Sequence, residues 1–158
     1  MLTHHRKTVS LSYMSLDLPL WSVVEASATL YEKGPERYHL LLPEPALEGH
    51  TLDAEPSSTA IASPRFLWLD LSPYRVILTM QTHGKFSYRH YWERGVFGLS
   101  RFWLQADDPV QCDQLRLRNY TRTLTLEGHP LPSHLRVEYE LWAQQVNLGH
   151  YILHIDID

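Results

Sequence analysis

Hydrophobic and polar residues alternate one by one along most of this chain. The run from Tyr74 to Thr82 and the run from Lys85 to Trp92 both follow this pattern. Alternation with a period of two is typical of a half-buried β-strand, whereas an amphipathic helix repeats every 3.6 residues. His83 and Gly84 lie between the two runs and suit a tight turn. We therefore predict two strands joined as a hairpin.

The C-terminal part of the chain carries the clearest alternation. Leu135 to Trp142 and Tyr151 to Ile157 each place apolar residues on one side and polar residues on the other, which predicts a closing antiparallel hairpin. Before them, Leu115 to Glu127 indicates one long strand in which the apolar side changes partway. A β-bulge adds one residue to a strand and would cause such a change, so we predict a bulge near Asn119.

The segment from Trp21 to Lys33 is compatible with two structures. Ser22 and Glu25 have the spacing of a helical capping box, and Gly34 would end that helix. The same segment alternates, however, and residues 37–42 alternate after a turn of the kind that joins two strands. The alternation on both sides of the turn favours a hairpin, and the helix remains the alternative.

The length of 158 residues fits one domain. Residues 1–18 have little pattern and are expected to form a loose N-terminal arm. Residues 43–64 contain four prolines and a Ser-Ser-Thr run, which predicts a long Pro/Ser-rich loop. Short strands joined by turns indicate an all-β, mainly antiparallel fold. We expect a single-domain β-sandwich or closed β-barrel with at most one or two short helices.

Composition narrows the class of protein further. The formal net charge is −4, and domains that bind duplex nucleic acid are usually basic. No apolar run approaches the ~18 residues of a membrane helix. A single cysteine, Cys112, excludes a disulfide within the chain and suits a reducing compartment. Polar residues interrupt the N-terminal apolar run, which argues against a signal peptide, so we expect a cytoplasmic protein.

Catalytic and metal-binding motifs are absent from the sequence. The ten histidines show no metal-binding spacing, and His150 and His154 would lie about 13 Å apart along one strand. The carboxylate of Asp113 beside Cys112 disfavours a thiolate. We therefore predict no catalytic residue, no metal and no cofactor. A metal-dependent, cupin-like enzyme is the least favoured interpretation, because its ligands would have to come from positions distant in sequence.

One region combines basic and aromatic side chains. Between His83 and Arg122, seven Lys and Arg residues stand against four Asp and Glu residues, in a chain that is acidic as a whole. Arginine beside an aromatic ring is typical of surfaces that recognise planar or acidic partners. Simple alternation, with aromatic rings inside and arginines in water, explains part of the pattern. The candidate binding residues are Arg89, Tyr91, Trp92, Arg101, Trp103, Arg116, Arg118 and Arg122.

The C-terminal segments Arg136–Trp142 and Leu148–Leu153 resemble the end of an uncharacterised group of cyanobacterial proteins. This resemblance covers the last part of the chain and implies a cytoplasmic bacterial protein with a role in photosynthetic housekeeping. It implies no catalytic residues. The bilin-lyase group of small β-barrels is an analogy at the level of fold.

Two functions therefore compete. The first is a non-catalytic module that binds another protein or serves an assembly through the basic, aromatic surface. The alternative is a barrel that binds a small molecule or chromophore, as a lipocalin-like carrier or a lyase-like protein does. A hollow interior favours the second and a filled interior excludes it.

Overall fold

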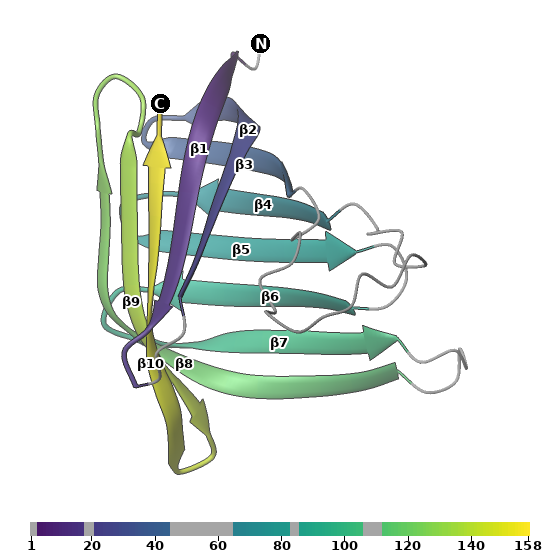
Figure 1. Ribbon diagram of the computed structural model, residues 1–158. Helices are drawn as coiled ribbons and strands as arrows, with labels where there is room; N and C mark the ends of the chain where they lie inside the picture. Colours follow the sequence, from purple (N-terminus) through teal and green to yellow (C-terminus); the bar gives the residue numbers. More distant parts are fainter. Residues whose placement is uncertain (1–2, 18–20, 45–64, 83–85, 106–111) are drawn as a thin grey trace.

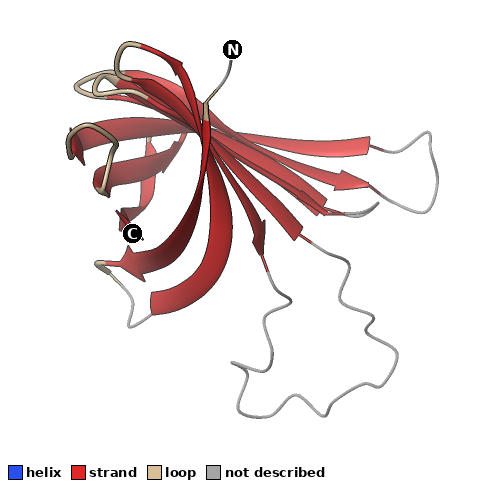
Figure 2. Cartoon of the chain, turned by 90° about the horizontal axis from the view of Figure 1, so that it is seen from above, coloured by secondary structure: helices blue, strands red, loops and turns tan. Residues whose placement is uncertain are grey.

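The computed structural model describes residues 3–17, 21–44, 65–82, 86–105 and 112–158. Within these ranges the chain forms ten β-strands and no helix (Figure 2). None of these residues therefore forms a helix capable of crossing a membrane. The strands close into one antiparallel barrel. The predicted all-β, mainly antiparallel class is confirmed, and of the two architectures considered the closed barrel is the one observed.

The ten strands follow one another around the barrel in chain order, so every neighbour except one is joined by the next turn or loop. The exception is the contact between the first and last strands, which closes the ring. The strands are β1 (His4–Ser15), β2 (Trp21–Gly34), β3 (Arg37–Glu44), β4 (Arg65–Leu71), β5 (Arg75–Thr82), β6 (Phe86–Glu93), β7 (Phe97–Gln105), β8 (Cys112–Glu127), β9 (His134–Ala143) and β10 (Val146–Ile157).

The barrel has two walls that cross at a steep angle. In Figure 1, β4 to β7 run side by side across the view, while β1, β9 and β10 run steeply past them. β8 is the longest strand, with 16 residues, and pairs with β7 and with β9. Its register against β9 shifts between Thr121 and Thr123, which confirms the predicted bulge close to Asn119. The predicted C-terminal hairpin is β9–β10.

The expectation of a loose arm over residues 1–18 was wrong. Residues His4–Ser15 form β1, which pairs with β2 on one side and β10 on the other. Val9 and Leu11 are buried in the core, whereas Ser10 and Ser12 lie on the outer side. The serines that interrupt the apolar run are thus the outward half of an alternating strand.

The segment from Trp21 forms a strand, as the favoured interpretation predicted. β2 and β3 are a hairpin in which Thr29 pairs with Leu41. Ala28 and Leu30 are buried against the core, and this burial outweighs the capping signal because a helix would scatter these residues around its circumference. Pro43 and Glu44 of the predicted 43–64 loop belong to β3. The rest of that loop, and the His83-Gly84 turn, lie outside the described residues.

The interior of the barrel has two unlike halves. In one, which we call the filled half, aliphatic side chains pack with no exposed surface. Its members are Val9, Leu30, Leu40, Leu69, Leu71, Val76, Leu135, Val137 and Ile155. In the other, the hollow half, tyrosine, phenylalanine and leucine side chains surround an open space.

Candidate functional site

The hollow half contains a partly open cavity of about 390 Å³. Inward-facing residues from eight of the ten strands line it, and only β3 and β8 contribute none. Leu67 of β4, for example, lines the cavity, whereas Leu69, two residues further along the strand, belongs to the filled half. The lining residues are Leu11, Tyr13, Ser22, Val24, Leu67, Leu78, Tyr88, His90, Phe102, Leu141, Tyr151 and Leu153.

Tyr13 and Tyr151 line one side of this cavity, and the buried Tyr139 packs behind them. The hydroxyl groups of Tyr13 and Tyr139 share a hydrogen bond. The Tyr151 ring stacks on both, with centroid distances of 5.7 Å to Tyr13 and 5.5 Å to Tyr139. Burial raises the pKa of Tyr13 and of Tyr139 well above the ordinary value, because the phenolate would lose its hydration. These hydroxyls therefore stay protonated and act as hydrogen-bond donors and acceptors without charge.

His90 is the polar centre of the cavity. Its ring stacks on Trp92 at 4.9 Å with planes 6° apart, and Phe102 meets it edge-on at 5.5 Å. Burial lowers the pKa of His90 to about 3, so the ring is neutral at physiological pH. Its Nδ1 atom lies 2.7 Å from Ser100 Oγ. Nε2 makes no hydrogen bond within the described part of the chain.

A short polar network supports this histidine. The Asn119 side chain donates a hydrogen bond from Nδ2 to Ser100 Oγ over 2.9 Å. Three nearby polar atoms at inward positions, Trp92 Nε1, Asn119 Oδ1 and Thr121 Oγ1, are buried without a hydrogen-bond partner among the residues described. A buried polar atom without a partner costs about 1 to 3 kcal/mol. The interior thus holds unused hydrogen-bonding capacity next to its apolar space.

A second concave site lies on the outer side of the wall. This groove, of about 710 Å³, crosses β4 to β8. Its lining residues are Trp68, Asp70, Ile77, Thr79, Arg89, Tyr91, Phe97, Gly98, Leu99, Arg101 and Arg118. The aromatic and aliphatic members lie on the outward half of each strand, opposite the residues that fill the core.

Three arginines form a row across adjacent strands at this groove. Arg101 of β7 pairs in register with Arg89 of β6 on one side and with Arg116 of β8 on the other. Like charges directly opposite each other destabilise a sheet. Among the residues that the structure describes, no carboxylate forms an ion pair with any of the three. We call Arg89, Arg101 and Arg116 the arginine row.

Aromatic rings flank the arginine row. The guanidinium carbon of Arg118 lies 4.3 Å from the centroid of the Phe97 ring, which is cation–π geometry. Arg75 approaches Tyr91 in the same way at 5.7 Å and donates to its hydroxyl over 3.4 Å. Arginine held flat against a ring keeps its edge available for a further acceptor.

The candidate residues from the sequence separate into three groups. Arg89, Tyr91, Arg101 and Arg118 line the groove, and Arg116 extends the row beside it. Trp103 lies at a half-buried outward position of β7, and Arg122 stands at the bulge of β8, 3.9 Å from Glu140. Trp92 does not belong to this surface: it is fully buried in the core. It shares an inward phase with His90, which places it on the opposite side of β6 from Arg89 and Tyr91.

Comparison with known proteins supports the architecture. The ywiB protein from Bacillus subtilis has a similar fold. Its crystal structure matches with a TM-score of 0.58 over 98% of this chain and 92% of that chain, at 11% sequence identity. No protein-family model matches the chain, and no curated protein matches it. The cyanobacterial resemblance and the cytoplasmic location accordingly stay predictions.

The sequence reasoning missed the polar network inside the barrel. His90 alternates in phase with Tyr88 and Trp92 along the sequence, and this shared phase is the available signal for its inward position. No local signal marked Ser100 or Asn119. In both segments, pairing with a neighbouring strand decides which residues point inward. The outward surface was easier to predict because charged residues mark it directly.

Proposed function

We propose that this barrel binds a small, mostly apolar and uncharged molecule inside the hollow half. The observation that carries this proposal is the cavity of about 390 Å³ lined by leucines and aromatic rings. Small-molecule sites in proteins are typically concave, mainly apolar and about 300 to 1,000 Å³ in volume, with a few polar groups that fix orientation. The cavity lies at the small end of this range and suits a compact ligand with an aromatic or cyclic body.

The charge of the lining supports a neutral ligand. None of the lining residues is Asp, Glu, Lys or Arg, and its one histidine is uncharged. A ligand carrying a full charge would lose its hydration here without an opposite charge to replace it. One hydroxyl, carbonyl or ring nitrogen on the ligand would instead meet Nε2 of His90, which has no partner among the described residues. Ligand binding without catalysis is favoured, because Ser100, whose hydroxyl lies next to His90, is fully buried and does not line the cavity.

Titration with N-phenyl-1-naphthylamine tests this proposal, because the dye is neutral and fluoresces in apolar surroundings. We expect saturable binding to the wild-type chain and at least about tenfold weaker binding when Leu67→Phe and Leu78→Phe together narrow the cavity. Trp68→Ala is the matched control, since Trp68 lies next to Leu67 but faces the outer groove. Unsaturable dye binding would overturn the proposal. Equal affinity of the wild-type chain and the variant with both Leu67→Phe and Leu78→Phe would overturn it as well.

We also infer a second candidate function, the docking of an acidic segment of a partner protein in the outer groove. The arginine row favours it, because three cations in register, with no ion-paired carboxylate among the described residues, gain most from an external anion. Aromatic rings beside them would cover the apolar part of the same segment. This candidate is independent of the cavity, because the two sites lie on opposite sides of the sheet.

A labelled hexaglutamate peptide provides the probe for the groove. Arg101→Glu with Arg118→Glu should lower its affinity at least about tenfold at low salt, and added salt should weaken binding to the wild type. Arg136→Glu is the control, because Arg136 is exposed on β9, away from the groove. If the groove variant binds the peptide as tightly as the control does, the docking function is wrong.

A further inference from the structure

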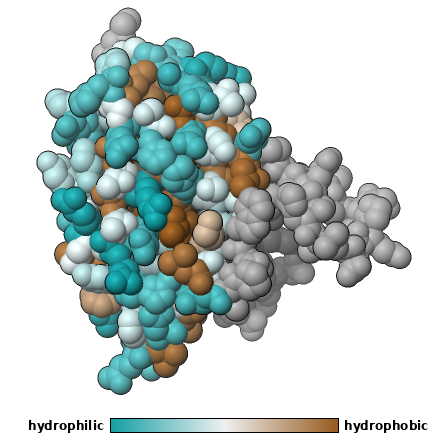
Figure 3. Space-filling view, turned by 60° about the vertical axis from the view of Figure 1, so that its left-hand side comes forward, coloured by the Kyte–Doolittle hydropathy of each residue, from teal (hydrophilic) through white to brown (hydrophobic). Residues whose placement is uncertain are grey.

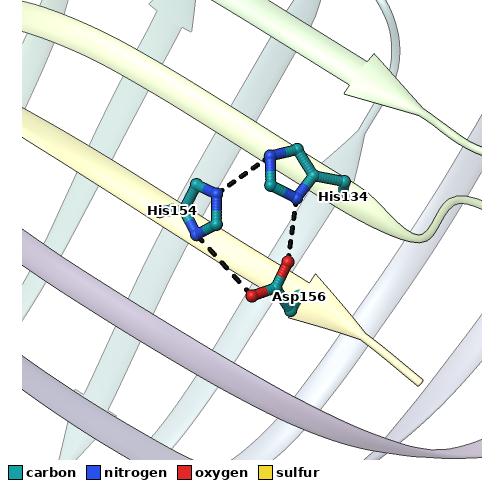
Figure 4. A group of neighbouring side chains, drawn as sticks. All are labelled: His134, His154 and Asp156. Carbon is teal, nitrogen blue, oxygen red and sulfur yellow. Dashed lines mark hydrogen bonds and ion pairs between the residues drawn. The ribbon is translucent and has the colours of Figure 1, made fainter.

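Two histidines and one aspartate meet on the outer surface of β9 and β10. His134 and Asp156 are direct cross-strand partners, and His154 lies two residues before Asp156 on the same side of β10. Figure 4 shows the three side chains turned toward one another. In Figure 3, which brings the β9 side of the molecule forward, most of the visible surface is hydrophilic. We call His134, His154 and Asp156 the His-His-Asp cluster.

The three side chains are close enough to share one ion. The Nε2 atoms of His134 and His154 lie 2.9 Å apart, and His134 Nδ1 lies 2.8 Å from Asp156 Oδ1. His154 Nδ1 lies 3.8 Å from the second carboxylate oxygen. One potential ligand atom from each residue falls within 4.8 Å of the others. Ligand atoms in a tetrahedral zinc site are about 3.3 Å apart, so small side-chain rotations would match this spacing.

The surroundings leave room for an ion. The side chains of His134 and His154 are each 31% exposed, and that of Asp156 is 51% exposed, so they can reorient without disturbing the core. On β1, the residues paired with His154 and Asp156 are serines. The charged residues paired in register with the cluster are Glu127 of β8, opposite His134, and Arg136 of β9, opposite His154; the two are opposite in sign.

We infer that the His-His-Asp cluster binds a divalent transition-metal ion of the zinc class. Two imidazole nitrogens and one carboxylate oxygen are the ligand set that zinc, cobalt and nickel accept. Three protein ligands leave one position for water or for a donor from outside the chain. The site lies on the outer side of the barrel wall and does not depend on the ligand proposed for the interior.

Metal titration of the untagged, full-length chain tests this inference. Calorimetry with Zn²⁺ should give one site per chain, and Co²⁺ should give the visible absorption bands of a tetrahedral complex. Both His134→Ala and His154→Ala should abolish the site. Asp156→Asn should weaken it by about tenfold or more. His39→Ala is the matched control, because His39 is an outward histidine 3.6 Å from one carboxylate, that of Asp70, and lies outside the cluster.

Circular dichroism of each variant establishes that the barrel is intact, which is expected because the substituted residues lie on the surface. Equal Zn²⁺ affinity in wild type, His134→Ala and His154→Ala would overturn the inference, since the metal would then bind elsewhere. Wild-type protein that gives neither a heat of binding nor a Co²⁺ spectrum would overturn it as well.

Discussion

Six strands, β1, β2, β4, β5, β9 and β10, contribute to both the filled half and the hollow half of the barrel, and the two halves differ in what they enclose. On β4, Leu69 is fully buried among other aliphatic residues, whereas Leu67, two residues away on the same side, lines the cavity. Alternation decides only which residues point inward. Whether the inside is solid depends on the size and stiffness of those residues, because aliphatic chains interdigitate and rigid rings hold a space open.

Buried polar side chains gather near the hollow half of the barrel. His90, Ser100 and Asn119 are linked by hydrogen bonds, and His90 stacks on Trp92, whose indole Nε1 has no hydrogen-bond partner among the described residues. A fold selected for stability alone would replace such groups with apolar side chains of equal size. Of these groups, His90 lines the cavity, and its presence there is consistent with recognition of a ligand's polar atom.

The largest expected effect comes from truncating the same residue type in each half. Leu69→Ala should lower the free energy of unfolding by about 3 to 5 kcal/mol, because it creates a new void in packed surroundings. Leu67→Ala should cost only about 1 to 2 kcal/mol, since its side chain already borders empty space. Urea unfolding of both variants measures the difference. Equal losses would mean that the two halves are packed alike.

A second effect concerns pH and the buried histidine. The pKa of His90 falls from 6.5 to about 3 on folding. The unfolded chain therefore takes up the proton first, and the stability that neutral His90 provides is complete above pH 6.5 and is lost as the pH falls toward 3. Between about pH 7.5 and 4.5 this group should account for a loss of about 2 to 3 kcal/mol.

The variant His90→Gln isolates that contribution, because glutamine does not titrate. Urea unfolding at both pH values should show a smaller loss for His90→Gln than for wild type, with the carboxylates contributing equally to both. A neutral ligand in the cavity would also protect the wild type against acid. Identical pH dependence in the two proteins would place His90 in contact with water.

Enlarging a side chain gives the next smaller difference. Leu78→Phe should change the free energy of unfolding by less than about 1 kcal/mol, because the cavity accepts the extra ring. Leu71→Phe, in the filled half, should cost about 1 to 3 kcal/mol through overpacking. Thermal unfolding of the pair checks this prediction, and a larger loss at Leu78 than at Leu71 would reverse the assignment of the two halves.

The smallest effect lies on the outer side of the wall. Arg101→Glu replaces two repulsive cross-strand pairs, with Arg89 and Arg116, by two attractive ones. It should raise stability by up to about 1 kcal/mol at low salt, and by less at high salt. Denaturation at two salt concentrations measures this gain. A loss of stability would mean that carboxylates elsewhere already neutralise the row.

Most of the fold could be predicted from the sequence because one-by-one alternation survives in nearly every strand. Where the prediction was wrong, over residues 1–18, small polar residues on the outward side of β1 hid an alternating pattern. The choice between sandwich and barrel could not be made locally, since it rests on the pairing of β1 with β10. That contact joins the two ends of the chain.

The candidate sites were predictable to different degrees. Arg89, Arg101 and Arg118 could be proposed because charge marks an outward surface, and strand pairing then brings them into one groove. Trp92 was misplaced because richness in aromatic residues says nothing about which side of a strand they occupy. The pairing of His134 with His154 depends on the register of β9 against β10, which the spacing of histidines along one strand does not reveal.

A crystal structure of the wild-type protein under xenon pressure tests the hollow interior most directly, because xenon enters apolar space that side chains leave empty. We expect xenon between Leu67, Leu78 and Phe102, and none among Leu69, Leu71 and Val76. In the Leu78→Phe variant the first site should disappear. Side chains that close the space around His90 and admit no xenon would contradict the account.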